Sequence, residues 1–381
     1  MNEPFKKALP MRIGNREIGI NHRPYIIAEI GVNHDGDVQR ALSLTDAAAD
    51  AGADAVKLQF FETDRLMSKA AKLAAYQKNA GETDPIEMLR RLELTIDEMA
   101  MVVERAHSKG IHAIVTVFST ELVPIAETLP WDAYKTASPD IVNKPLLEAL
   151  METGKPMIVS TGASDLDEVK RGVGWIHSAK DRLAVLHCIS CYPTPLEDSA
   201  LAGCEAIREA LDCVVGYSDH TATHHPGPLL APLNVSVFEK HLTYDNTAAG
   251  PDHAASLNPD QFKDYVHKTQ KSFFDDDSVE VLEEIRHKEP FLTYFGPKEK
   301  RVLDCEQDVR AVSRQSVVST CDIPTGTTIT RDMLTIKRPG TGILAYDLES
   351  VIGCTTTQDI EADVPINTHD LSQFQASMAR V

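Results

Sequence analysis

The chain has 381 residues, of which 43% are hydrophobic and 6% aromatic, a composition typical of a soluble enzyme with a large buried core. Its 38 Lys and Arg residues oppose 57 Asp and Glu residues, and the formal net charge of −19 argues against a nucleic-acid partner because phosphate backbones would be repelled. No apolar run of about 18 residues occurs and no apolar signal core follows Lys6 and Lys7, so we expect a cytoplasmic protein with no membrane partner.

Short apolar or β-branched runs recur along the first two thirds of the chain, with helix-like stretches between them. This alternation is typical of repeated βα units, which form a parallel sheet. Eight such runs predict an α/β fold closed as a (β/α)8 TIM barrel. The expected strands are 25–30, 55–60, 112–117, 133–137, 157–161, 183–189, 214–217 and 235–240.

The stretches between the strands carry helix signals. Residues 41–51 are rich in strong helix formers and end at Gly52. Thr95 and Glu98 resemble a capping box, which opens a helix that ends near Gly110. The apolar stripe expected to face the barrel comprises Met99, Val102, Val103 and Ala106.

The C-terminal part has a different pattern. Charged helical sequence follows Lys271, and Pro- and Gly-containing turns with short β-branched runs come later. We assign residues 1–285 to the barrel, 286–310 to a linker and 311–381 to a small second domain. Because a domain of about 70 residues has a marginal core, we expect it to dock on another surface.

Polar side chains mark the ends of several predicted strands. Glu29 closes the first strand, Lys57 and Gln59 lie in the second, and Lys135 lies in the fourth. Lysine is rare in a barrel interior, so two of them indicate a phosphate site to which nearby hydroxyls add donors. A structural lysine paired with a neighbouring acid is the alternative for each.

Two histidines close the last two strands. His220 follows the seventh strand and His241 the eighth, which places both imidazoles at the mouth of the barrel. Two imidazoles with a carboxylate and open positions are typical of a catalytic divalent metal site. The adjacent pair His224 and His225 is a candidate second metal point, but we expect a solvated loop pair.

The seven cysteines have irregular spacing, which favours reduced thiols over a disulfide framework. Cys188 and Cys191 match C-x-x-C at a strand end. Because no second pair with zinc spacing is present, we expect buried small side chains rather than a redox or metal site.

Eight motifs in order along the chain carry a resemblance to a known family. They are A-E-I-G-V-N-H from Ala28, V-K-L-Q from Val56, Y-K-T-A-S from Tyr134, S-T-G from Ser160, L-H-C-x-x-x-Y-P-T-P from Leu186, G-Y-S-D-H-T from Gly216, E-K-H-L-T from Glu239 and G-P-D-H-A-A-S-L from Gly250. This set resembles the sialic acid synthase family. Residues 337–343 resemble part of its C-terminal antifreeze-like (SAF, β-clip) domain. The resemblance implies an enzyme that condenses phosphoenolpyruvate with an N-acylated hexosamine to a nine-carbon 3-deoxy-2-keto acid.

The resemblance also implies roles for individual residues. His220 and His241 match metal ligands, usually for Mn²⁺, with Mg²⁺ or Co²⁺ as other divalent candidates. Positions that hold phosphoenolpyruvate match Lys57, Thr116, Lys135, Ser138, Ser160, Ser190 and Ser218, and positions around the sugar match Glu29, Gln59, Tyr192 and Asp252. We assign catalytic roles to Glu29, Lys57, Lys135 and Asp252. Arg338 matches an arginine that the small domain inserts into a partner subunit, which predicts a domain-swapped homodimer.

The sequence leaves the identity of the acceptor sugar open. Departures from the family pattern, such as Val117 and Ala163, surround the sugar side more than the phosphate side. N-acetylmannosamine is the first expectation, and the 2,4-diacetamido-trideoxy hexose of an N,N'-diacetyllegionaminate synthase is the alternative. A metal aldolase, a synthase for a phosphorylated sugar and a non-catalytic carbohydrate-binding barrel are further alternatives.

Overall fold

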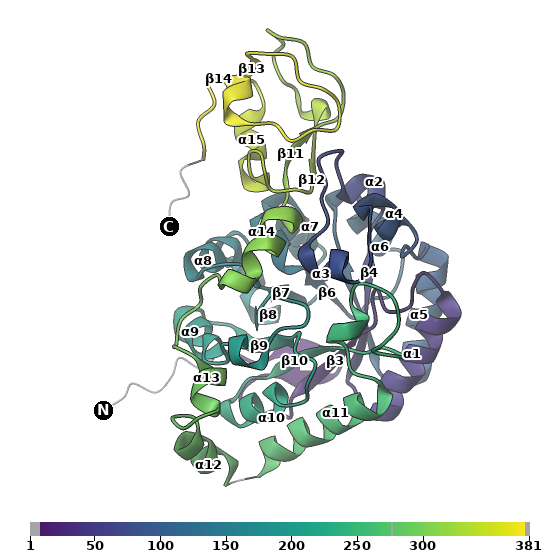
Figure 1. The fold of residues 1–381 in the computed structure, drawn as a ribbon, viewed down its shortest axis with the longest axis vertical. Coiled ribbons are helices and arrows are strands. Elements are labelled where there is room, and N and C mark those ends of the chain that lie inside the picture. The colour runs from purple at the N-terminus through teal and green to yellow at the C-terminus, as the bar shows by residue number, and fades with distance from the viewer. Residues whose placement is uncertain (1–7, 276, 378–381) are drawn as a thin grey trace.

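A computed structural model describes residues 8–275 and 277–377 and shows a closed barrel of eight parallel strands (Figure 1). Around the barrel the order is β10-β3-β4-β5-β6-β7-β8-β9. The strands are β3 (Tyr25–Glu29), β4 (Ala55–Phe60), β5 (His112–Val117), β6 (Ala133–Thr136), β7 (Met157–Ser160), β8 (Leu183–Cys188), β9 (Val214–Asp219) and β10 (Val237–His241). All eight predicted strands are confirmed, each with ends within about two residues of those expected.

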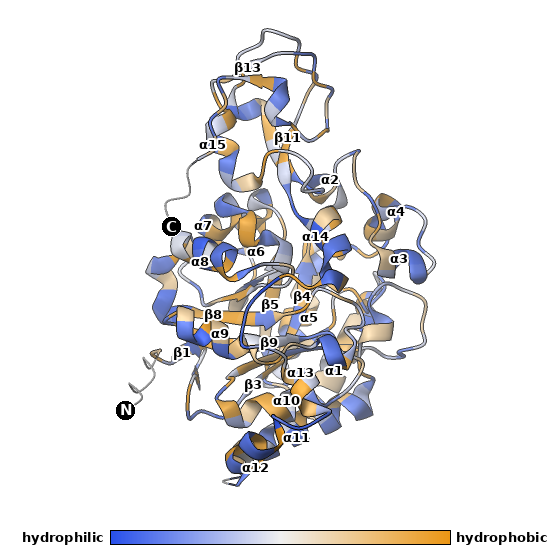
Figure 2. Cartoon of the chain, turned by 60° about the vertical axis from the view of Figure 1, so that its left-hand side comes forward, coloured by the Kyte–Doolittle hydropathy of each residue, from blue (hydrophilic) through white to orange (hydrophobic). Residues whose placement is uncertain are grey.

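Helices surround the barrel and bury their apolar sides against it. Figure 2 shows hydrophobic residues predominating along the barrel strands and mixed hydropathy along the helices. The main ones are α1 (Val38–Ala51), α5 (Ile96–Ser108), α7 (Lys144–Glu152), α8 (Leu166–Trp175), α9 (Gly203–Ala210) and α11 (Pro259–Phe274). Shorter ones are α2 (Thr63–Leu66), α3 (Ala75–Asn79), α4 (Pro85–Arg90), α6 (Val123–Ala126) and α10 (Pro226–Leu230).

The predicted helix signals are confirmed. Gly52 ends α1 in the left-handed conformation with φ 86°. Thr95 and Glu98 form the capping box of α5, and the predicted stripe of that helix is buried.

The N-terminal end of the barrel is closed and apolar. A hairpin of β1 (Met11–Ile13) and β2 (Arg16–Ile18) packs its buried side chains against the strands. The same cluster contains barrel-interior residues such as Ile27, Ile114 and Leu186. The polar side chains of the barrel interior therefore gather at the opposite, C-terminal end.

The chain after α11 forms three short helices and a small β domain. The helices are α12 (Ser278–Ile285), α13 (Phe291–Phe295) and α14 (Gln307–Ser313). The small domain contains β11 (Ser316–Ser319), β12 (Leu334–Lys337), α15 (Leu348–Val351), β13 (Thr355–Thr356) and β14 (Leu371–Ser372) around its own apolar core. The predicted domain limits at 285 and 310 stay predictions, and the segment 1–7, in which no signal peptide is expected, lies outside the described residues.

Hydrogen bonds and ion pairs join α14 and the small domain to the barrel. The backbone of Arg338 pairs with the α2 region, donating to Leu66 O at 2.9 Å and accepting from Ser68 N at 3.0 Å. Arg310 and Arg314 both bind Glu168 of α8, with shortest distances of 2.8 and 2.7 Å. Among the helices of the described ranges, none combines the length and apolar character that crossing a membrane needs.

The ion pairs of Glu168 predict an acid-dependent stability. Burial alone would raise the pKa of this carboxyl, but hydrogen bonds from Arg314 and Arg310 lower it from 4.5 to about 2. A carboxyl with a depressed pKa stabilises the folded chain above the unfolded pKa, and this stabilisation is lost as pH falls. Glu168→Gln should therefore cost about 2 kcal/mol at pH 7, and the cost should shrink below about pH 4.5. Urea unfolding of both proteins at about pH 7 and pH 3 measures it, and an equal cost at both would refute this prediction.

Candidate active site

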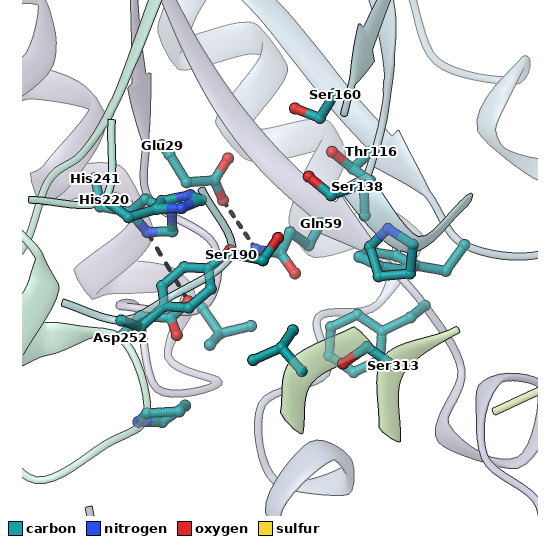
Figure 3. Close-up of a pocket in the computed structure, with 18 of the residues that line it drawn as sticks. Glu29, Gln59, Thr116, Ser138, Ser160, Ser190, His220, His241, Asp252 and Ser313 are labelled. Atoms are coloured by element: carbon teal, nitrogen blue, oxygen red, sulfur yellow. Dashed lines mark hydrogen bonds and ion pairs between the residues drawn. The ribbon is translucent and has the colours of Figure 1, made fainter. Parts of the chain in front are cut away.

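One cavity of about 130 Å³ lies at the C-terminal ends of the barrel strands. Figure 3 shows His220, His241 and Asp252 on one side of it and the hydroxyls of Thr116, Ser138 and Ser160 on the other. All predicted site residues line this cavity: Glu29, Lys57, Gln59, Thr116, Lys135, Ser138, Ser160, Ser190, Tyr192, Ser218, His220, His241, Asp252 and Arg338. The sequence thus identified neighbours in space, and the roles assigned to them stay predictions.

The strand register explains why these side chains meet. In the parallel barrel, Glu29 stands beside Lys57 on one neighbouring strand and beside His241 on the other. Thr116 stands beside Lys135 in the same way. Residues at one level of adjacent parallel strands project together, so a single layer of the barrel carries cations, carboxylates and imidazole.

The two lysines are buried and paired with acids. Lys57 Nζ contacts the Glu29 carboxylate, donates to Thr116 Oγ1 at 2.9 Å and lies 3.3 Å from Glu239 Oε1. Lys135 Nζ donates to Ser160 Oγ at 2.8 Å and lies 3.1 Å from Glu239 Oε2. Each lysine therefore has the acidic neighbour expected for a structural lysine, yet each also lines the cavity, where it can bind an anionic substrate.

Glu239 is a site residue that the sequence interpretation missed. It lies between the two lysines and accepts a hydrogen bond from Ser218 Oγ at 2.6 Å. Burial opposes ionisation, but the charges of Lys135 and Lys57 hold its pKa far below the usual range. The available signal was its place two residues before His241, which puts both side chains on the same face of β10.

Glu29 has a different electrostatic environment. Burial, together with the charge of Glu239, raises its pKa to about 7 against the opposing charge of Lys57. Gln59 Nε2 donates to Glu29 Oε1 at 3.1 Å and to Gly31 O at 2.8 Å, which fixes the amide. The Glu239 carboxylate thus stays ionised, while Glu29 exchanges a proton near neutral pH, as a general acid or base requires.

The hydroxyl side of the cavity is built around a glycine. Ser138 Oγ accepts a hydrogen bond from Gly162 N at 2.9 Å. A Cβ at Gly162 would lie 2.8 Å from Ser138 Oγ and would also collide with Ser190 Oγ. The glycine of Ser160-Thr161-Gly162 therefore leaves the space in which these hydroxyls point at the cavity.

The two imidazoles fit a divalent metal. Their ring centroids are 5.4 Å apart. His220 Nδ1 is hydrogen-bonded to Ile189 O at 2.8 Å, the support that metal-bound histidines commonly have, and its Nε2 lies 3.5 Å from the Ser218 hydroxyl, which lines the cavity. His241 Nδ1 is buried without a hydrogen-bond partner in the described chain and lies 3.8 Å from Asp252 Oδ2. Within residues 8–275 and 277–377 no group of three or more His, Cys, Asp or Glu is arranged so that it could hold a metal ion.

An aromatic pair and an arginine close the cavity. The centre of the Tyr192 ring lies 4.1 Å from the centre of the His220 ring and 5.0 Å from the centre of the Tyr76 ring. The guanidinium of Arg338 lies 5.5 Å from the centre of the Phe118 ring, and its Nε has no hydrogen-bond partner among the residues described. Arg338 reaches the cavity of its own chain. Insertion into a partner subunit, and the domain-swapped homodimer it implies, stay predictions.

Two of the other sequence motifs lie outside the cavity lining. His225 is exposed and His224 is bonded to Lys268 Nζ at 3.0 Å, as expected of a solvated loop pair. All seven cysteines are free thiols. Within the C-x-x-C motif, the expectation of a buried side chain is confirmed for Cys188. It is wrong for Cys191, which is partly exposed in the loop that follows β8.

A barrel with buried lysines, carboxylates and imidazoles at its C-terminal mouth, under a small β domain, defines a TIM-barrel enzyme. The chain belongs to the NeuB family, whose family model matches residues 44–279, and the SAF domain model matches residues 314–372. The resemblance to sialic acid synthases is thereby confirmed, as is the fold of a barrel followed by an SAF domain.

Several similar proteins are named as synthases of nonulosonic acids or their phosphates. The chain is 34% identical over 345 residues to the N,N'-diacetyllegionaminic acid synthase of Legionella pneumophila, covering 89% of this chain and 92% of that one. It is 29% identical over 351 residues to human N-acetylneuraminate-9-phosphate synthase, covering 91% and 92%. The crystal structure of the spore coat polysaccharide biosynthesis protein SpsE of Bacillus subtilis superposes with a TM-score of 0.80 at 28% identity, covering 96% and 100%.

Proposed function

We propose that this protein condenses phosphoenolpyruvate with an N-acylated hexosamine and water to give a nonulosonic acid and phosphate. The observation that carries the proposal is the buried pair Lys57 and Lys135, which faces hydroxyls on one side of a cavity whose other side holds His220 and His241. On a chain of net charge −19, such a pair is the local cation source that a trianionic substrate needs.

The site residues support a chemically balanced sequence of steps. C3 of phosphoenolpyruvate forms a bond to the aldehyde carbon of the open-chain sugar, and the sugar oxygen takes a proton. Water adds to the cationic C2 and loses a proton, which leaves a hydroxyl on C2. The bond between C2 and the bridging oxygen then breaks, the hydroxyl oxygen forms the C2 carbonyl, and its proton leaves with the phosphate. Lys57 and Lys135 hold the phosphate and carboxylate, Glu239 stabilises the cation at C2, and Glu29 transfers protons.

His220 and His241 are the residues that would hold a divalent ion, with Mn²⁺ as the first candidate and Mg²⁺ or Co²⁺ as others. When bound there, such an ion supplies Lewis acidity toward a carbonyl oxygen. Asp252 lies beside His241, and burial raises its pKa to about 6, so this carboxyl can orient a sugar hydroxyl in either protonation state.

N-acetylmannosamine, the first expectation from the sequence, is one candidate acceptor, but one observation favours the 2,4-diacetamido-trideoxy hexose over it. A continuous apolar cluster lines the cavity: Val32, Phe61, Leu66, Met88, Leu92 and Phe118. Such a wall suits the C6 methyl group and a second acetamido methyl better than hydroxyls at these positions, because unpaired hydroxyls lose hydrogen bonds to water. The name of the Legionella relative agrees with this choice.

A panel of acceptors tests the proposal. Phosphate release is measured with phosphoenolpyruvate, Mn²⁺ and one sugar at a time: N-acetylmannosamine, the diacetamido sugar, N-acetylmannosamine 6-phosphate, and N-acetylglucosamine as control. The apolar wall predicts a kcat/KM at least about tenfold higher for the diacetamido sugar than for N-acetylmannosamine. Release with the phosphorylated sugar alone would replace the proposal by a synthase for that sugar, and no release with any sugar would favour a carbohydrate-binding barrel.

A further inference from the structure

A buried ion pair lies behind the two imidazoles of the candidate active site. Lys240 Nζ lies 3.0 Å from Asp219 Oδ2, and both side chains are fully buried. Lys240 belongs to β10 and Asp219 is the last residue of β9, and the two stand beside each other in the barrel. Because two buried charges lose their hydration, an apolar pair of similar size would often stabilise the fold equally well. Stability alone therefore does not explain this pair.

Lys240 lies on the outer face of the barrel, between two residues of the site. Glu239 and His241 line the cavity, and side chains alternate along a strand, so the lysine between them points the opposite way. Its Nζ lies there 5.8 Å from the centre of the Tyr265 ring of α11. The ammonium group thus supports β10 from behind, at the point where this strand carries its site residues.

Lys240 also binds the turn that carries the other imidazole. Its Nζ donates a hydrogen bond to Thr221 O and lies 3.3 Å from Thr221 Oγ1. Asp219 Oδ1 accepts a hydrogen bond from Thr221 N at 2.9 Å. The two chain neighbours of His220 are therefore both in contact with the residue that precedes His241.

The backbone pairing of β9 with β10 ends at the same place. The register joins four pairs of residues, of which Asp219 with Lys240 is the last. His220 and His241 follow directly, and the centres of their rings are 5.4 Å apart at the cavity (Figure 3). The separation of the imidazoles is therefore set just beyond the paired strands, where the buried ion pair joins the two strand ends.

We propose that Asp219 and Lys240 are positioning residues that hold His220 and His241 at the separation required to bind one divalent ion. The inference rests on the metal site of the proposed function. Without the ammonium group, Thr221 O loses its donor, and the ion pair no longer joins the end of β9 to β10. Loss of groups that orient metal ligands typically lowers metal affinity by about 10- to 100-fold. Lys240→Met should therefore raise the Kd for Mn²⁺ by at least about tenfold.

A double variant separates positioning from stability. Lys240→Met leaves the Asp219 carboxylate buried without its cationic neighbour, so this variant should also unfold at a lower urea concentration. Asp219→Leu combined with Lys240→Met removes both charges and should unfold near the wild-type urea concentration. Its Mn²⁺ affinity should stay at least about tenfold below that of wild type, because Thr221 is still not bound.

Arg286→Met is the matched control. Arg286 Nη2 lies 2.6 Å from Glu205 Oε1 in a partly buried ion pair outside the cavity lining. Because this pair does not contact the strand ends that carry the imidazoles, its loss should lower the urea midpoint and leave the Kd for Mn²⁺ unchanged.

Calorimetric titration of each full-length protein with Mn²⁺ alone, together with urea unfolding, decides the proposal. Wild-type Mn²⁺ affinity in a folded Lys240→Met variant or in the double variant would overturn it and assign the pair to stability. Failure of the wild type itself to bind Mn²⁺ would overturn it as well. A wild type that binds Mn²⁺ but releases no phosphate with any acceptor would contradict the proposed condensation, while the titrations would still decide the role of the ion pair.

Discussion

Replacing Lys135 by methionine is expected to raise the KM for phosphoenolpyruvate by about 100- to 1000-fold, because truncating one partner of a buried, hydrogen-bonded charge pair costs about 3–4 kcal/mol of binding free energy. Lys135 Nζ is bonded to Ser160 and Glu239, and both neighbours line the cavity. Without the ammonium group, the buried Glu239 carboxylate keeps only Lys57 as a cationic neighbour and repels an incoming phosphate.

Initial rates of phosphate release at varied phosphoenolpyruvate concentration measure this effect. Lys155→Met is the matched control, since Lys155 pairs with Glu127 at 3.4 Å away from the cavity lining. Circular dichroism of each variant confirms the fold. A Lys135→Met variant with an unchanged KM and a low kcat would assign this lysine to the chemical step and not to substrate binding.

The second large effect is expected at the imidazoles. His220→Ala and His241→Ala should each weaken Mn²⁺ binding by more than about 100-fold, since removal of a ligand exceeds the 10- to 100-fold loss typical of its supporting partners. Activity should fall by a comparable or larger factor, because Lewis acidity toward the sugar carbonyl depends on the same ion.

Calorimetric titration with Mn²⁺ is the direct measurement for these variants. The double variant His224→Ala, His225→Ala is the control, because this pair lies on an exposed loop and is bonded to Lys268. Loss of Mn²⁺ affinity in the control, with normal binding in His220→Ala, would move the metal site to the loop pair.

The barrel was predictable because its signals are local. Each strand is a short apolar or β-branched run, and helices such as α5 and α1 begin or end at a cap, Thr95 and Gly52 respectively. Site residues such as Lys57 and Lys135 were visible because charged side chains are out of place in a strand interior. In a parallel barrel, position near a strand end alone places them at one mouth.

Features that depend on distant pairs were not predictable in the same way. Glu239 gains its importance only from two lysines on other strands, and the register that joins them is set by closure of the barrel. The position of Arg338 depends on backbone hydrogen bonds with Leu66 and Ser68, which no pattern of side chains in the sequence predicts.

The proposed condensation is tested most directly with phosphoenolpyruvate that carries ¹⁸O at the oxygen bridging C2 and phosphorus. In single-turnover reactions with an N-acylated hexosamine, the account predicts one phosphate for each nonulosonic acid, with the label in the phosphate because the C–O bond breaks. Label retained in the organic product, or phosphate released at the same rate without sugar, would contradict the proposed condensation.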